Sequence, residues 1–372
     1  MIFPEEIKAK SLNRGEKLGR SSNLELFRIL LMLMIIAHHY VVNSALLGDI
    51  TPTNLTGNAL FLSLYGWGGK TGINCFILIT GYFMCRKDFS WRKFFKLVFE
   101  VYFYATTIYL IFLLTGYETC SLSDISRVVL YIPADVGHGF VGSFICLYLL
   151  IPFINKMIQG MDKRQYQQLL IILLVIFTGV GTFVPGRFYE YIGWYVTVYL
   201  IGGYIRIYGI PPLSSLKRRI CFLVVSHGWA FASILFILYY YKLKGGADNI
   251  GNIYYFVNDS NKLFAVLCSV SLFVVFNNIN TKKTNIYINK VATATFGVLL
   301  IHGNSNTMRR FLWYDLLNND SYYNSQYLWI HAILSVVGVY AVCVMIDLLR
   351  IRLIERPLFG LLDKKLFLKS SK

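Results

Sequence analysis

An arginine and a histidine lie eleven residues apart in one apolar stretch of this sequence, LELFRILLMLMIIAHHYVV. They are Arg28 and His39, and apart from His38 every residue between them is apolar. In a helix this spacing turns about 1100°, about 20° from three full turns, so both side chains project from one face about 16 Å apart. A guanidinium suits an anionic group. An imidazole, with an ordinary pKa of about 6.5, suits a general base. The pair therefore predicts an anion site and a base on one helix face.

Both residues also have simpler interpretations. Arg28 can extend its side chain to the lipid headgroups. His39 can form a hydrogen bond between helices, as is usual for a lone histidine within a membrane. His38 points about 80° away from Arg28, and the sequence assigns it no purpose.

The elements that position these residues are membrane helices. The 372 residues are 56% hydrophobic and 15% charged, whereas a soluble chain carries about 25% charged residues. The sequence predicts an all-α bundle of about ten transmembrane helices. The predicted spans are 24–45, 67–85, 94–115, 139–158, 167–185, 190–208, 219–241, 261–278, 291–311 and 328–349.

The basic residues orient this bundle. Of 36 lysines and arginines, 27 fall in the two tails or in the even-numbered loops and the span ends beside them, 8 fall in the odd-numbered loops and the span ends beside them, and Arg28 lies within the first span. Basic residues collect on the cytoplasmic side of a membrane. We therefore expect a cytoplasmic N-terminal tail (1–22) without a signal peptide, a membrane domain (23–350) and a basic cytoplasmic C-terminal tail (351–372). The net charge of +17 then needs no nucleic acid to explain it.

The cysteines predict neither a disulfide framework nor a zinc site. The sequence has seven cysteines, an odd number, and no two of them form a CxxC pair. Buried free thiols are the expected state, and no metal site or permanently bound cofactor is predicted.

Several segments resemble one family. Arg28-x10-His39 has the form of the Arg-x10-His signature of the acyltransferase-3 family, bacterial membrane O-acyltransferases that modify surface polysaccharides. Further segments are similar to that family's motifs, in its order: NLELFRILLMLMIIAHHY (23–40), GKTGINCFILITGYFM (69–84), GHGFVGSFICLYLLIPFIN (137–155), TATFGVLLIHGN (293–304) and LLRIRLIERPLF (348–359). The sequence departs from the family pattern at two places. Phe140 is the aromatic residue nearest to the position where a tryptophan usually follows His138, and leucines replace a tyrosine before His302.

The resemblance implies a ten-helix enzyme of the plasma membrane. It would take an acyl group, most often acetyl from cytoplasmic acetyl-CoA, and transfer it to a hydroxyl of a cell-surface polysaccharide or its lipid-linked precursor. Arg28 would meet the CoA phosphates or position the thioester. His39 would deprotonate the acceptor or take the acyl group transiently.

Further residues are predicted to line the substrate site. Helix rise places His302 about 16 Å into the ninth span, near the level of His39. Glu100 is a candidate counter-ion for Arg28, or it is neutralised by a shift of its pKa. His138 lines an acceptor entrance or is an ordinary exposed loop residue. Asp347 and Arg350 are interpreted as a structural pair at the end of the last span.

The segment Thr80-Gly81-Tyr82 stands where the family reads Ser-Gly-Tyr or Ser-Gly-Phe. Gly81 would let a backbone or an acyl chain approach closely, and Tyr82 offers a hydroxyl. Ordinary packing of small residues between helices is the alternative.

Two other functions fit the composition. A polysaccharide exporter or flippase shares the size, basicity and aromatic content. A membrane glycan polymerase fits less well, because the longest outer loops have only about twenty residues and such enzymes tend to carry a large polar one. The sequence predicts no particular oligomeric state.

Overall fold

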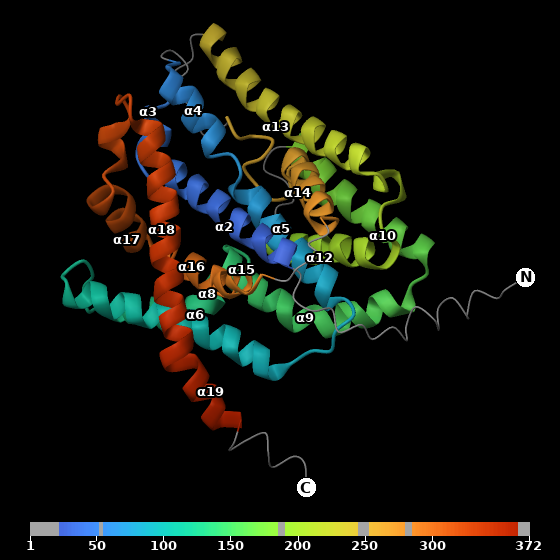
Figure 1. Cartoon of the computed structure of the whole chain (residues 1–372), viewed down its shortest axis with the longest axis horizontal. Coiled ribbons are helices and arrows are strands. Elements are labelled where there is room, and N and C mark those ends of the chain that lie inside the picture. The colour runs from blue at the N-terminus through green and yellow to red at the C-terminus, as the bar shows by residue number, and fades with distance from the viewer. Residues whose placement is uncertain (1–21, 52–54, 185–189, 245–252, 280–284, 364–372) are drawn as a thin grey trace, which may run out of the picture.

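The structure is a computed structural model that describes residues 22–51, 55–184, 190–244, 253–279 and 285–363. Within these ranges the regular secondary structure is entirely helical (Figure 1), which confirms the predicted all-α class. Residues 1–21 of the predicted N-terminal tail and 364–372 of the C-terminal tail lie outside the described residues.

The helices of the first half of the chain are α2 (Ser22–Val42), α3 (Leu46–Asp49), α4 (Gly57–Tyr65), α5 (Gly69–Met84), α6 (Trp91–Leu114), α7 (Leu122–Val129), α8 (Tyr131–Asp135), α9 (Phe140–Gly160), α10 (Lys163–Leu174), the π-helical η1 (Val175–Val180) and α11 (Gly181–Phe183). Those of the second half are α12 (Tyr191–Tyr208), η2 (Pro211–Leu213), α13 (Leu216–Lys244), α14 (Leu263–Asn277), α15 (Ile286–Ala292), α16 (Thr295–His302), α17 (Asn306–Arg310), η4 (Phe311–Leu316), η5 (Asn319–Tyr322), α18 (Leu328–Arg350), η6 (Ile351–Glu355) and α19 (Arg356–Leu362).

Helix α2 runs through the middle of the bundle, beside α5 (Figure 1). It separates two hydrophobic clusters. Phe27 and Leu31 of α2 pack into a cluster with α5, α9, α12 and α14. Ile35 and Ile36, further along α2, pack into a second cluster with α4, α6, α16 and α18. Burial of both parts of this helix fixes its rotation about its own axis, and therefore fixes where its few polar side chains point.

The ten predicted spans are only partly confirmed. Each predicted segment contains a helix, but six helices are long and apolar enough to cross a membrane, or seven if one bent pair is counted as a span. Helix α5 has 16 residues and α14 has 15, which is shorter than a full crossing. The chain is thus a multi-pass helical membrane protein, and these two short helices lie against each other inside the bundle.

The predicted ninth span is not one straight helix. Its two parts, Ile286–His302 and Asn306–Leu316, meet at an angle of 95°. The local sequence explains the break. The amide of Asn304 donates to the carbonyl of Leu300 over 3.1 Å at the end of α16, and the hydroxyl of Ser305 accepts from the N–H of Met308 over 3.1 Å as the N-cap of α17.

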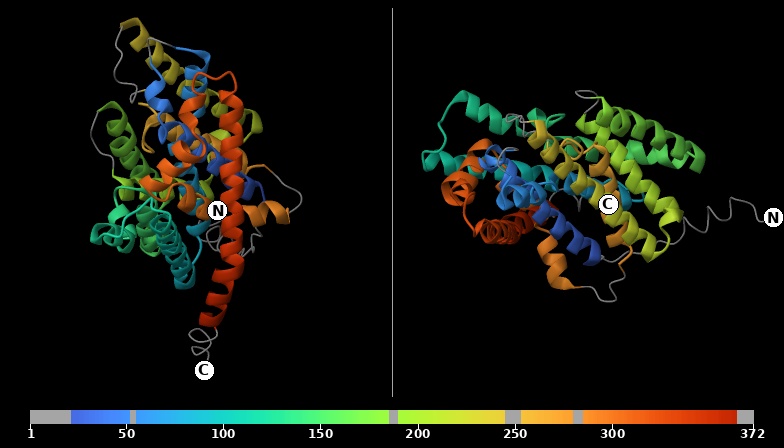
Figure 2. Two further views of the ribbon diagram at one scale, coloured as in Figure 1. Left: turned by 90° about the vertical axis from the view of Figure 1, so that its left-hand side faces the viewer. Right: turned by 90° about the horizontal axis from the view of Figure 1, so that it is seen from above.

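The last span extends further than predicted. Helices α18, η6 and α19 follow one another from Leu328 to Leu362, past the predicted boundary at 350. Figure 2 shows them as one long rod that extends beyond the rest of the bundle. The start of the predicted C-terminal tail is therefore helical.

All seven cysteines are free thiols. Four of them are buried, as predicted, whereas the prediction is wrong for the exposed Cys120 and Cys221.

Candidate active site

Two histidines from distant parts of the chain meet in the centre of the bundle. Nδ1 of His39, near the end of α2, lies 3.0 Å from Nε2 of His302, the last residue of α16. Helix α16 packs against α2, α6 and α18, which fixes the approach of the two rings. His302 thus lies at the level of His39, as predicted, and the structure adds a direct contact between the two rings.

The hydrogen bonds define the tautomer of each ring. Nδ1 of His302 lies 2.6 Å from the carbonyl oxygen of Val298, which can only accept, so this nitrogen carries a proton. With both rings neutral, Nε2 of His302 is an acceptor, and Nδ1 of His39 donates to it. The remaining nitrogen of His39, Nε2, is then unprotonated and able to take a proton from a substrate.

The two rings differ in access. His302 is 0% exposed, whereas His39 is partly exposed. This difference suits a division of roles in which His39 meets the substrate and His302 holds the ring in one orientation. The arrangement of a base with an orienting partner is the geometry that activated bases share.

Two basic side chains lie close enough to act electrostatically on His39. One is Lys70, at the start of α5, and the other is Arg309 of α17. Arg309 also acts on His302. Arg309 lies near the end of the predicted ninth span (291–311), and the sequence analysis assigned it no role. The signal that could have found it is the Asn304-Ser305 helix break, which turns α17 back beside the end of α16.

Arg28 lies on the same continuous helix as His39, so the predicted axial separation of about 16 Å applies. Its side chain is 39% exposed and forms an ion pair of 3.4 Å with Glu25, one turn earlier in α2. Its Nε atom is buried without a hydrogen-bond partner in the described part of the chain.

The predicted pairing of Glu100 with Arg28 is wrong. Glu100 of α6 lies 3.0 Å from Arg350 at the end of α18. Arg350 also contacts Asp347 at 2.7 Å and Glu355 at 2.8 Å. The predicted pair of Asp347 and Arg350 is thus confirmed, and Glu100 belongs to it rather than to Arg28.

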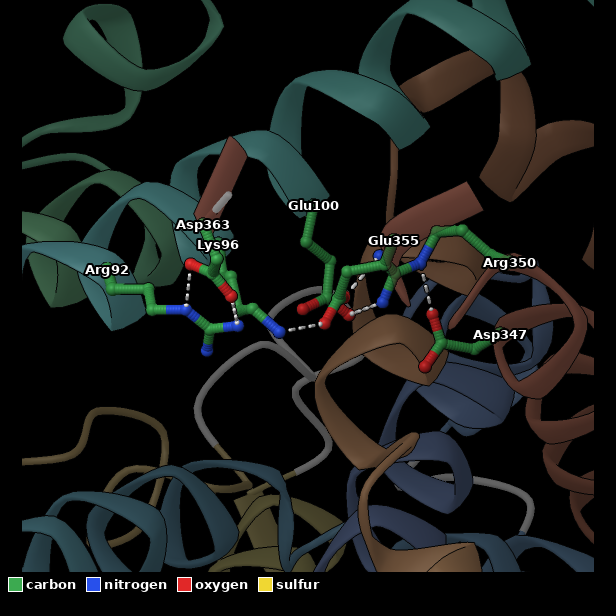
Figure 3. A network of polar contacts seen from close by, with 7 residues as sticks. All are labelled: Arg92, Lys96, Glu100, Asp347, Arg350, Glu355 and Asp363. Atoms are coloured by element: carbon green, nitrogen blue, oxygen red, sulfur yellow. Dashed lines mark hydrogen bonds and ion pairs between the residues drawn. The ribbon is translucent and has the colours of Figure 1, made fainter. Parts of the chain in front are cut away.

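Figure 3 shows how this ionic network continues along α6. Lys96 contacts Glu355 at 3.1 Å, and Arg92 contacts Asp363. The hydrogen bonds from Arg92 lower the pKa of the Asp363 carboxyl. The network joins α6 to the rod formed by α18, η6 and α19, because its members alternate between these elements.

His38 has a structural role that sequence reasoning did not find. Its Nδ1 lies 2.5 Å from the carbonyl oxygen of Gly66. A Cβ atom at Gly69 would collide with the His38 ring. His38 therefore fills the space between the end of α4 and the start of α5, on a different side of α2 from His39.

The close approach predicted at Gly81 is that of a backbone and not that of an acyl chain. A Cβ atom there would collide with the backbone carbonyl of Tyr199 in α12, and Gly202 of α12 faces the carbonyl of Leu78 in the same way. The two glycines let α5 and α12 cross in close contact. The alternative of helix packing is correct.

We expect Gly81→Ala to destabilise the protein by about 1–3 kcal/mol, because backbone atoms of α12 cannot move aside for the methyl group. The melting temperature of the purified protein in detergent measures this. Gly228→Ala in α13 is the matched control, since a Cβ there meets nothing within 4 Å. Equal melting temperatures for the two variants would contradict the packing role.

Among the described residues, the structure shows no contact between the histidine pair and the remaining predicted site residues. The Thr80 hydroxyl donates to the carbonyl of Phe76 at 2.9 Å, within its own helix. The Tyr82 hydroxyl accepts from Arg206 at 3.1 Å. His138 is exposed between α8 and α9. Substrate binding by these residues stays a prediction.

The fold and this centre define a class: a multi-pass helical membrane protein with a hydrogen-bonded histidine pair inside its bundle. Within the described residues, no group of three or more His, Cys, Asp or Glu side chains is placed to hold a metal ion.

Comparison with known families identifies the chain further. The model of the acyltransferase-3 family, described as an acyltransferase domain, matches residues 21–348. The chain therefore belongs to this family and is a membrane acyltransferase. No curated protein and no solved structure matches it.

Proposed function

We propose that the protein is a membrane O-acyltransferase of the bacterial plasma membrane. It transfers an acetyl group from cytoplasmic acetyl-CoA to a hydroxyl of a cell-surface polysaccharide or its lipid-linked precursor. The observation that carries this proposal is the bond between His39 and His302, which leaves Nε2 of His39 as a base.

The reaction needs one base and one leaving thiolate. The acceptor hydroxyl gives its proton to Nε2 of His39, and its oxygen attacks the carbonyl carbon of the thioester. The C–S bond breaks, the acyl group stays on the acceptor oxygen, and the CoA thiolate leaves. The proton then passes from Nε2 to the sulfur, which restores neutral His39. Hydrogen bonding to His302 stabilises the charge on His39 between these steps.

Arg28 supports the donor side of the proposal. Its partly exposed guanidinium and unpartnered Nε suit the CoA phosphates. About 16 Å of helix separate Arg28 from His39, a length that the extended pantetheine arm of CoA can span. Glu25 would hold the guanidinium until the donor arrives.

The test compares surface glycan from cells with and without the gene for this chain. We expect the O-acetyl signals in its proton NMR spectrum to disappear on deletion and to return on complementation. Purified protein in lipid nanodiscs should also move radiolabelled acetyl from acetyl-CoA to that deacetylated glycan. An exporter would instead lower the amount of surface glycan and leave its acetylation unchanged, which would refute the proposal.

A further inference from the structure

A cavity of about 230 Å³ lies between the end of α6, helices α7 and α8, and the turn from α16 to α17. Its wall is built from hydrogen-bonding and aromatic side chains. The main ones are Tyr109, Phe112, Glu118, Tyr131, Asn304 and Arg309.

One cation in this wall, Arg127, is already paired with carboxylates. Arg127 forms ion pairs of 2.9 Å with Glu118 and 3.4 Å with Asp124. Glu118 also accepts a hydrogen bond from the hydroxyl of Thr307. These groups hold α7 and α17 together across the cavity, and because Arg127 faces two carboxylates they leave no cation there for an anionic ligand.

The charge of Arg309 is not balanced in this way. Its only hydrogen bond in the described part of the chain runs to the amide oxygen of Asn306 at 3.3 Å, and its Nε is buried without a partner. Asp135 lies within electrostatic reach but beyond ion-pair distance, and its carboxylate accepts from the backbone N–H of Gly142 at 2.7 Å. A partly buried cation with so little compensation is costly unless a ligand supplies an anion.

The cavity borders the histidine pair. Asn304 in its wall is two residues from His302, and its carbonyl accepts from the Tyr131 hydroxyl at 3.1 Å. A Cβ atom at Gly303 would lie 3.8 Å from Cε1 of His39. A single turn of backbone therefore separates the cavity from the His39 ring, and Arg309 acts on both sides of it.

We propose that this cavity binds the acceptor as a sugar unit that carries a carboxylate or a phosphate, and that Arg309 binds this anion. Aromatic rings suit the apolar face of a sugar ring, and amide and hydroxyl groups suit its hydroxyls. A guanidinium binds both kinds of anion through paired hydrogen bonds. The role as acceptor site rests on the proposed acetyl transfer, whereas anion binding by Arg309 does not.

Binding is tested without catalysis, by melting the purified full chain in detergent. The probes are methyl glucuronide for the carboxylate, glucose 1-phosphate for the phosphate, and neutral methyl glucoside. Since a ligand that binds the folded state raises the melting temperature, we expect a shift with at least one anionic probe and none with the neutral sugar at the same concentration. Arg309→Gln should lose the shift, and the exposed neighbour Arg310→Gln should keep it. His39→Ala should also keep it.

The outcomes separate this inference from the proposed function. If no anionic probe shifts the melting temperature, or if Arg309→Gln keeps the shift, the inference is wrong even when acetyl transfer is real. If the shift behaves as expected and His39→Ala still acetylates glycan, anion binding stands and the proposed mechanism fails. With an active enzyme, Arg309→Gln should raise the KM for the glycan at least tenfold and leave the KM for acetyl-CoA unchanged. An equal rise in both would refute the role as acceptor site.

Discussion

We expect His39→Ala to abolish the proposed acetyl transfer while the protein still accumulates in the membrane. The expected loss in kcat is about 10²–10⁴-fold, the usual contribution of a positioned general base. Accumulation should hold because His39 is partly exposed, and its contact with His302 is one hydrogen bond among many around α2. Transfer of radiolabelled acetyl to glycan measures kcat, and immunoblotting of membranes measures the accumulation of the protein.

Variants of His302 test whether this residue positions the His39 ring or only contributes to the stability of the bundle. His302→Ala should lower kcat by about 10²-fold, because the His39 ring loses its fixed orientation, and should change the pH profile of kcat. His302→Gln should recover part of the activity, since its amide oxygen can accept from Nδ1 of His39. His227→Ala is the control, because its ring bonds to the carbonyl of Leu223 within its own helix. Full activity of His302→Ala would contradict the role of His302 in positioning the His39 ring.

Arg350→Ala has the largest expected effect on stability. Arg350 is 3% exposed and contacts three carboxylates, Glu100, Asp347 and Glu355. Removing one partner from buried charges costs about 3–5 kcal/mol. We expect the variant to accumulate poorly and to melt at a lower temperature in detergent.

The control for this prediction is Arg352→Ala, two residues further along and exposed. It should change stability by at most about 0.5 kcal/mol. A compensating variant that adds Glu100→Gln and Asp347→Asn to Arg350→Ala should recover part of the loss, because it removes the unpaired negative charge. If Arg350→Ala and the wild type have the same melting temperature, the ionic network does not hold α6 against α18.

Much of the site could be predicted from the regular geometry of single helices. Helix periodicity placed Arg28 and His39 on one face of a helix that is continuous over both. Rise per residue placed His302 near the level of His39, and the two rings do meet. These predictions succeeded because each depends only on regular geometry within one helix and on the thickness of a bilayer.

Predictions that needed contacts between helices succeeded less often. Glu100 was assigned to Arg28, since opposite charges at a similar depth attract, but depth does not give the direction in which α6 faces. The ten spans were counted from apolar length, which does not distinguish a full crossing from a short internal helix such as α5 or α14. The role of Gly81 likewise depends on its neighbour in α12.

The 95° break after His302 has a consequence for how the enzyme can be altered. The partner of His39 in the histidine pair, His302, is the last residue of α16, whose position is fixed by three neighbouring helices. Arg309 and Asn304, which line the proposed acceptor cavity, lie beyond His302 at the break or in the short helix that follows it. In the proposed function, proton transfer by the histidine pair and anion binding by Arg309 would thus lie on separable lengths of chain. Exchange of residues 304–316 between members of the family is the change we expect to redirect the enzyme to another glycan and keep its histidine pair intact.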